Sequence, residues 1–581
     1  FLKFVGFSTA AASLAACEGP VHKSIPYVVQ PEEIRPGISN YYATTVADGF
    51  DLASILVKTR EGRPIKIENN PDNPINCSAN ARVQASVLSL YDKLRLKGPN
   101  RSGTPVSWTT LLEQSRQQLD KLQFEGAQVV LLTQSFASPS TYDLINQLLT
   151  RYSNIKHITY DAVSYSHALD AFEKAYGERV LPTYDFSKAE TIVSLDADFI
   201  GDWQGGRHSA DYVKTRVPLK KNGKAKMSTH FQFEANMTLS GAAADKRVPM
   251  SAAQQKQVLA ALYSELTNSQ ASGDQTIQKW AKVAAKYLRK SGKKGVVITG
   301  LPSVEAQRIA LAINQELGSI VIDTQHTTTI RQGSANQLTQ LVDDLNSGLV
   351  QGIITVGVNP VYTLANGDQF AAGLDKVKFS LSFSMNNDET ASKAQWVAAT
   401  PHYLESWGDV EFKTNYFGLT QPTIRPLFDT KQFQDVLLSW LEKDTNYRDE
   451  LRTYWEQNIL NGESWNKALH DGFHVHEKPI KKKNYSDSVS DALDTLASSE
   501  QDGYSLQLYT KTGLGDGQQA NNPWLQELPD PITRMTWDNY LTVSKYDAEI
   551  IGLWNETQSD GALNGGLSLI HISEPTRPDE I

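Results

Sequence analysis

The sequence predicts an α/β protein of several domains, in which two doubly wound parallel sheets follow a small β-rich N-terminal domain. Short apolar runs of strand length alternate with amphipathic helical segments along most of the 581 residues, which is typical of parallel sheets covered by helices. Residues 50–68 alternate apolar and polar positions on either side of Glu61-Gly62, which indicates a β-hairpin. The hydrophobic content of 40% allows a sizeable core.

These patterns divide the chain into six parts. We expect an export signal at 1–17, an extended arm and the β-rich domain at 18–100, α/β domains at 101–290 and 291–445, a polar insertion and connector at 446–566, and a foreign tail at 567–581. Strands are expected at 127–132, 156–160, 190–195, 295–299, 319–323 and 352–356, and helices at 108–122, 141–152, 166–176, 304–317 and 336–347. Ligands of such domains bind at the carboxyl ends of the strands.

The first 16 residues carry one Lys and an apolar run too short for the roughly 20 residues of a membrane-spanning helix. Leu14-Ala15-Ala16-Cys17 resembles a bacterial lipobox, in which Cys17 carries the lipid, and the opening Phe-Leu-Lys resembles the second half of a twin-arginine signal. We therefore expect export in the folded state and a lipid anchor at Cys17, on the periplasmic side of a bacterial inner membrane. The alternatives are a short buried helix that ends in an ordinary Cys, or a disulfide from Cys17 to Cys77.

The other end of the chain looks foreign. Residues 567–577 read LSLIHISEPTR, which matches the in-frame translation of a transposase sequencing adapter. We expect 567–581 to come from that adapter and the native protein to continue beyond Gly566.

Charge and cysteine count exclude two classes of function. A formal net charge of −9 argues against a nucleic-acid partner, because binding phosphates requires a basic face. A [4Fe-4S] cluster normally takes four cysteine thiolates, whereas this chain has two cysteines. A cluster held in the usual way by this chain is therefore excluded.

Several motifs resemble the molybdopterin oxidoreductase superfamily, and most closely the N-terminal part of the iron-sulfur subunit (B subunit) of bacterial alternative complex III. Each motif is weak alone, but together they occur in order over nearly all of residues 14–566. They are Ile25-Pro26-Tyr27-Val28, Gly62-Arg63-Pro64-Ile65-Lys66-Ile67-Glu68-Asn69-Asn70-Pro71, Ser194-Leu195-Asp196-Ala197-Asp198-Phe199, Gly357-Val358-Asn359-Pro360, Asp388-Glu389-Thr390 and Leu404-Glu405-Ser406-Trp407-Gly408-Asp409. Asn69 stands where the family usually has Gly.

The resemblance implies a pterin nucleotide site, for which this chain keeps only some of the parts. Active members have a Cys followed by Lys-Gly that links cluster to pterin, whereas residues 76–82 hold the lone Cys77 and no Lys-Gly. We read Cys77 as a buried or free thiol. The positions that match a vestigial pterin site are Ser164, Asp196, Asp198, Gly357, Asn359 and Pro360.

Each of these positions also has a purely structural interpretation. Ser164 matches the metal-ligand position, but serine is among the favoured helix N-caps, and we favour the cap. Asp196 and Asp198 either face a nucleotide or cap the end of a strand.

His470, His474 and His476 form the only histidine cluster, and such a cluster binds Zn or Cu in some proteins. We favour solvent-exposed histidines.

The resemblance implies a non-catalytic or scaffold subunit of a membrane-bound quinol:electron-acceptor oxidoreductase. Its implied partners are a multihaem cytochrome c and integral membrane quinol-binding subunits. Iron-sulfur clusters are expected only in a C-terminal part beyond this sequence, and no cofactor and no catalytic residue is assigned here, although a bound molybdopterin is the alternative. The rival functions are an active molybdopterin-dependent reductase of the polysulfide or tetrathionate type, with Ser164 on the metal, and a periplasmic ligand-binding lipoprotein.

Overall fold

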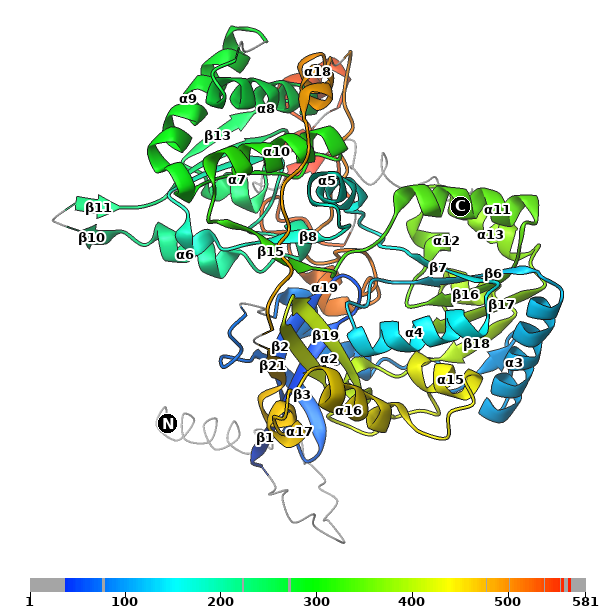
Figure 1. Ribbon diagram of the computed structural model, residues 1–581. Coiled ribbons are helices and arrows are strands. Elements are labelled where there is room, and N and C mark those ends of the chain that lie inside the picture. The colour runs from blue at the N-terminus through cyan, green and yellow to red at the C-terminus, as the bar shows by residue number, and fades with distance from the viewer. Residues whose placement is uncertain are drawn as a thin grey trace, which may run out of the picture.

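The computed structural model describes residues 37–565 apart from 76–78, 222–223, 270–272, 477, 501, 538, 554 and 558–562. The predicted export signal with Cys17, the thiol of Cys77 and the predicted foreign tail lie outside the described residues. The described chain forms three lobes that meet at a common centre (Figure 1).

The N-terminal lobe is built on a three-stranded antiparallel sheet of β1 (Ser39–Ala47), β2 (Leu52–Arg60) and β3 (Arg63–Asn69), covered by α2 (Ala81–Leu90). Arg60 pairs with Arg63, so a two-residue turn joins β2 to β3. Glu61 and Gly62 both have positive φ, at 52° and 75°, which is the backbone of a tight hairpin turn. The predicted hairpin is present.

A second lobe contains the larger sheet, of order β5-β4-β18-β17-β16-β6-β7. Its five strands from β18 to β7 are parallel, and β4 and β5 extend it antiparallel. α3, α4 and α15 cover one face and α11 and α13 the other, so this sheet is doubly wound. The strands are β4 (Asn100–Arg101), β5 (Thr104–Pro105), β6 (Gln128–Thr133), β7 (Ile155–Thr159), β16 (Val350–Val356), β17 (Phe379–Ser384) and β18 (Trp396–Ala399), and the helices are α3 (Trp108–Phe124), α4 (Pro139–Arg151), α11 (Ala335–Ser347), α12 (Pro360–Thr363), α13 (Gly367–Leu374), α14 (Glu389–Lys393) and α15 (Phe433–Trp440).

The third lobe contains a four-stranded parallel sheet of order β13-β12-β9-β14. α8, α9 and α10 pack on one of its faces through a continuous apolar core. Its elements are α5 (Ser166–Tyr176), β9 (Thr191–Leu195), α6 (Ser209–Arg216), β12 (Thr229–Glu234), α7 (Leu239–Ala243), β13 (Lys246–Pro249), α8 (Ala252–Leu266), α9 (Gln275–Ser291), β14 (Gly295–Thr299) and α10 (Val304–Leu317). Two short antiparallel pairs border it, β8 (Leu181–Tyr184) with β15 (Ile322–Thr328) and β10 (Leu219–Lys221) with β11 (Lys224–Lys226).

The mixed α/β fold class is confirmed, but the boundary predicted at residue 290 does not separate the two sheets. β6 and β7 lie in the predicted first domain and pair with β16 of the predicted second domain, whereas β14 lies past the boundary and pairs with β9. Both sheets are assembled from discontinuous segments. Apolar periodicity identifies a strand but not its partner, so it predicts only a linear division of the chain.

The segment predicted as a polar insertion packs against two lobes. Within it, α16 (Tyr447–Asn458) buries Leu451 and Trp455 in the core of the larger sheet's lobe. α18 (Ser490–Ala497) docks on α8 and α10, where Arg308 pairs with Asp487 at 2.7 Å. The remaining elements are β19 (Gly408–Lys413), β20 (Tyr416–Thr420), α17 (Trp465–Asp471), β21 (Phe473–Val475), α19 (Pro523–Glu527), α20 (Lys545–Ile550), β22 (Asn555–Thr557) and β23 (Leu563–Gly565).

Within the described ranges, no helix combines the length and apolar character needed to cross a membrane.

Candidate functional site

A cavity of about 970 Å³ lies at the carboxyl edge of the larger sheet. Residues that follow β6, β7, β16, β17 and β18 form its floor, the loop between β1 and β2 closes one side, and residues 516–523 close another. This is where the ligands of doubly wound α/β proteins bind, and the volume suits a small organic molecule. The cavity is therefore the candidate site.

The predicted Gly357-Val358-Asn359-Pro360 motif leads from β16 into α12 and lines this cavity, except for Pro360, which is buried at the first turn of α12. Gly357 has φ +64°, and a Cβ at this position would meet the side chain of Gln134 at 2.8 Å. The Gln134 amide, oriented to satisfy its neighbours, donates to the carbonyl oxygens of Gly357 and Asp48. Glycine is required here because the turn needs a positive φ and because a Cβ would clash with the side chain of Gln134.

The polar groups of the same loop are already bonded within the protein. The Asn359 amide donates to Glu389 at 2.7 Å, and its oxygen accepts from the backbone N–H and the hydroxyl of Thr390. The backbone N–H of Gly357 donates to the carbonyl of Phe383. Asn359 therefore joins this loop to α14, and its role in reading a nucleotide stays a prediction.

The charge of the cavity wall is strongly one-sided. Among the described residues that line it, none is Lys or Arg, and His402 is neutral at pH 7 because burial, and then Arg95, lower its pKa to about 3. Seven carboxylates line the cavity, those of Asp48, Asp92, Asp161, Asp388, Glu389, Asp409 and Asp516.

Two of these carboxyl groups have pKa values raised well above the ordinary value for aspartate. Burial, followed by the charges of Asp51 and Asp516, raises the pKa of Asp48 to about 7. Burial is also the main cause that raises the pKa of Asp516 to about 6, and the charge of Asp51 adds to it. Both groups therefore lie where an added negative charge is unfavourable.

A pterin nucleotide carries a diphosphate, which proteins hold with Lys, Arg or free backbone N–H groups. The wall offers carboxylates in place of cations, and the N–H groups of Gly357 and Val361 already donate to protein acceptors. The residues present do not fit this group.

The strand end that carries Asp196 and Asp198 is filled by the chain itself. The Gln507 amide donates to Asp196 at 2.5 Å, and burial raises the pKa of Asp196 to about 6. Asp198 accepts from the N–H and the hydroxyl of Ser240, at 2.9 and 2.7 Å. These contacts are those of carboxylates that cap loops after a strand, and binding of a nucleotide here stays a prediction.

Ser164 lies just before α5 with an exposed side chain, and it is not among the described residues that line the cavity. Its hydroxyl oxygen accepts from the backbone N–H of Ser166 at 3.2 Å. The N-cap of α5 is Tyr165, and no side chain caps this helix, so the N-cap role expected for Ser164 is wrong and its contact is that of a local turn. Ligation of a metal by Ser164 stays a prediction.

The three histidines do not converge on a common point. His470 is exposed and bonds to Asp471, whereas His476 is buried and bonds to the carbonyl of Ile459. The His474 and His476 rings are 6.2 Å apart. Across the part of the chain that the structure describes, no three His, Cys, Asp or Glu side chains are grouped to hold a metal ion.

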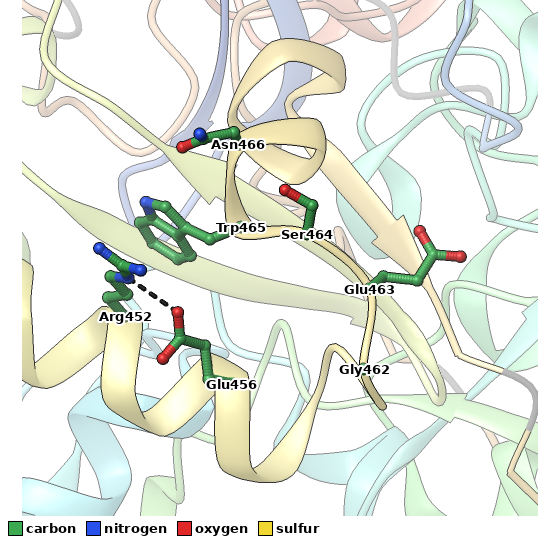
Figure 2. Close-up of a pocket in the computed structure, with 7 residues that line it drawn as sticks. All are labelled: Arg452, Glu456, Gly462, Glu463, Ser464, Trp465 and Asn466. Atoms are coloured by element: carbon green, nitrogen blue, oxygen red, sulfur yellow. Dashed lines mark hydrogen bonds and ion pairs between the residues drawn. The ribbon is translucent and has the colours of Figure 1, made fainter.

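A smaller hollow of about 340 Å³ lies between α16 and the start of α17 (Figure 2). Arg452 and Glu456 form an ion pair across one turn of α16 at 2.8 Å, with side chains 55% and 47% exposed. Trp465 lies beside them at the first position of α17. Such a solvent-exposed pair contributes little energy and indicates no chemistry.

Sequence reasoning missed four carboxylates of the cavity, Asp48, Asp92, Asp161 and Asp516. Asp161 comes two residues after β7, so the rule that polar residues at parallel strand ends face ligands identifies it. Asp48 lies in the β1–β2 loop, and Asp516 lies in a segment without periodicity. Only the folded chain brings the latter two to the sheet edge.

The fold is of the molybdopterin oxidoreductase type. Acetylene hydratase from Pelobacter acetylenicus has a similar structure, with a TM-score of 0.58 and 12% identity over 75% of this chain and 74% of the other. A protein of Nitratidesulfovibrio vulgaris, "Menaquinone reductase, molybdopterin-binding-like subunit", is 23% identical over 501 residues, covering 76% of this chain and 71% of that protein. No family model matches. The chain is therefore similar in sequence to a molybdopterin-binding-like subunit and similar in fold to a molybdopterin enzyme.

Proposed function

We propose that this chain is a non-catalytic, scaffold subunit of a membrane-bound quinol:electron-acceptor oxidoreductase of the alternative complex III type. In this proposal the chain lies on the periplasmic side of the inner membrane, anchored through a lipid on Cys17. It docks a multihaem cytochrome c and integral membrane quinol-binding subunits, while iron-sulfur clusters in a further C-terminal part carry the electrons. The similarity to a subunit named for menaquinone reductase supports the link to quinones.

The wall of the cavity carries the proposal. An active pterin enzyme needs a place for an anionic nucleotide, whereas this cavity presents seven carboxylates and, among its described lining residues, no Lys or Arg. Bringing a diphosphate against these carboxylates costs several kcal/mol for each unpaired contact, on the order expected for buried charges. A domain that keeps the fold without such a place serves to support other subunits.

Metal content tests this proposal directly. The complete protein is purified from membranes with its partner subunits, and molybdenum, tungsten and iron are determined by mass spectrometry. We expect no molybdenum or tungsten above background. The variants Ser164→Ala and Ser107→Ala both remove an exposed serine that accepts from a helix N-terminus, so Ser107→Ala is the matched control.

One molybdenum per chain that is lost in Ser164→Ala and kept in Ser107→Ala would make this chain a catalytic subunit. That result would favour the rival reductase of the polysulfide or tetrathionate type.

Anchoring has its own test. Cys17→Ser should move the protein from the membrane fraction to the soluble periplasmic fraction, because the lipid attaches through the thiol. Retention of Cys17→Ser in membranes after a high-salt wash would show that protein partners, rather than a lipid, hold it there.

A further inference from the structure

The cavity has features that point to a ligand of the opposite charge to a nucleotide. We propose that it binds an organic polycation of the aliphatic polyamine class, whose ammonium groups are held by Asp48, Asp161 and Asp516. This inference goes beyond the proposed function, because a scaffold subunit does not require a ligand.

The three carboxylates come from distant parts of the chain and line the same cavity, two of them close to Tyr160. Asp48 follows β1, Asp161 directly follows Tyr160 after β7, and Asp516 belongs to the C-terminal segment. The Tyr160 hydroxyl bonds to Thr363, and burial raises the Tyr160 pKa, with the charges of Asp516 and Asp161 adding to the rise. Tyr160 thus lies within the electrostatic reach of two of the carboxylates.

Unpartnered acceptors in the same wall are independent evidence for a ligand with N–H groups. Asp161 is 8% exposed, and one of its oxygens accepts from the backbone N–H groups of Gln332 and Gly333, whereas Oδ1 has no partner. The side-chain oxygens of Asn386 and Gln519 also line the cavity without a partner. A buried acceptor without a donor is unfavourable, and a ligand rich in N–H groups supplies the missing hydrogen bond.

The absence of a compact ligand group among the described residues favours an extended cation over a metal ion. A metal such as Ca²⁺ needs several oxygens within about 2.6 Å of one point. Within the described ranges no three His, Cys, Asp or Glu side chains are so grouped. A polyamine carries separate ammonium groups along a flexible chain and can reach carboxylates that stand apart.

Aromatic rings complete the match. Phe136, Tyr160, Tyr362 and Trp407 line the cavity along with the carboxylates. Ring faces attract ammonium groups, and the rings also bury the methylene segments between them. No cationic side chain among the described lining residues competes for these sites.

Isothermal titration calorimetry of the complete protein with spermidine tests the proposal. We expect saturable binding to the wild type at physiological ionic strength. Asp161→Asn and Asp516→Asn should each weaken it about tenfold, the effect of roughly 1.4 kcal/mol per lost charge pair. Asp343→Asn, which removes an exposed carboxylate on α11, is the control of equal charge change and should bind like the wild type.

Folding of each variant is checked by circular dichroism and thermal unfolding. The Asp161→Asn substitution keeps a side-chain oxygen for the N–H groups of Gln332 and Gly333, and Asp516→Asn provides a second variant in a different segment. Absence of saturable binding to the folded wild type would overturn the proposal, as would equal weakening in Asp343→Asn.

Two further probes separate other ligands. Guanosine diphosphate stands for the nucleotide part of a pterin cofactor, and its binding in this cavity, in competition with spermidine, would overturn the proposal. Displacement of spermidine by Mg²⁺ at matched ionic strength would indicate a metal site and would also overturn it. Spermidine binding and metal content are measured in separate experiments. The scaffold proposal can therefore fail or hold whatever the spermidine titration shows.

Discussion

The guanidinium carbon of Arg82 lies 5.0 Å from the centroid of the Phe50 ring, at the point where the three lobes meet. The guanidinium of Arg331 lies over the same ring at 5.1 Å and donates to the carbonyl oxygens of Gly49 and Phe50. Arg82 also pairs with Asp51 at 2.7 Å and with Asp202 at 2.8 Å. This buried ionic cluster therefore joins the N-terminal lobe to the loop after β9 and to the segment between β15 and α11.

Arg82→Ala should destabilise the protein by about 3–5 kcal/mol, because it leaves the carboxylate of Asp51 buried without its cation. Asp51 is 6% exposed at its side chain and receives two hydrogen bonds from Arg82. The midpoint of urea denaturation measures the effect. Arg116→Ala is the control: it breaks an exposed pair with Glu442 and should cost less than about 1 kcal/mol. Equal shifts for the two variants would contradict the proposed strength of the central cluster.

Gly515→Ala should loosen the C-terminal segment from this centre. Gly515 has φ +55°, and a Cβ there would lie 2.6 Å from the Phe50 ring and 2.9 Å from Arg82 Nε. Gly503 has φ +69° with open space around it, so Gly503→Ala carries the backbone cost of roughly 1 kcal/mol without the clash. Limited proteolysis should cleave the segment after residue 502 several times faster in Gly515→Ala than in Gly503→Ala. Similar rates would show that the segment is not held at this contact.

Asp48→Asn should stabilise the protein at neutral pH. The pKa of Asp48 is raised from 3.8 to about 7, so the folded state retains a proton that the unfolded state releases. The stabilisation due to this group is complete below pH 3.8 and is lost as the pH rises toward 7. Asn keeps the Oδ1 acceptor used by the N–H groups of Phe50 and Asp51 and carries no charge.

Thermal unfolding at pH 4 and pH 8 measures this difference. We expect Asp48→Asn and the wild type to be similar at pH 4, and the variant to be more stable at pH 8 by about 2 kcal/mol, allowing for water in the cavity. Asp343→Asn, on the exposed side of α11, should show no such pH dependence. A variant less stable than the wild type at pH 8 would mean that Asp48 is held ionised by an unidentified cation.

Local elements follow from the sequence where short-range chemistry decides them. The hairpin turn at Glu61-Gly62 and the helix Val304–Leu317 occur at the predicted positions, because a turn residue and an N-cap, Ser303, fix their ends. The strand predicted at 319–323 is instead Ile322–Thr328, antiparallel to β8. Its position depends on a partner more than 130 residues away.

The candidate site is only partly predictable for the same reason. Gly357 and Asn359 reach the cavity because they directly follow a strand of the sheet. Asp516 reaches it through a segment that has no periodic pattern and that Arg82 holds through a hydrogen bond to the carbonyl oxygen of Thr512. Interactions of this range leave no local trace in the sequence.

Asn359→Ala distinguishes a structural from a nucleotide-reading role for this residue. Loss of its bonds to Glu389 and Thr390 leaves the backbone N–H of Thr390 without its acceptor and should cost about 1–3 kcal/mol. Asn366→Ala, which removes only a 3.4 Å contact to Gln369, should cost less than about 1 kcal/mol. Thermal unfolding of the ligand-free protein measures both, and chromatography of an acid extract reports any bound nucleotide.

An unchanged unfolding temperature in Asn359→Ala, with nucleotide present in the wild type and lost in the variant, would assign Asn359 to a nucleotide. The bonds that it makes to α14 favour the opposite result, a lower unfolding temperature and no nucleotide in either protein.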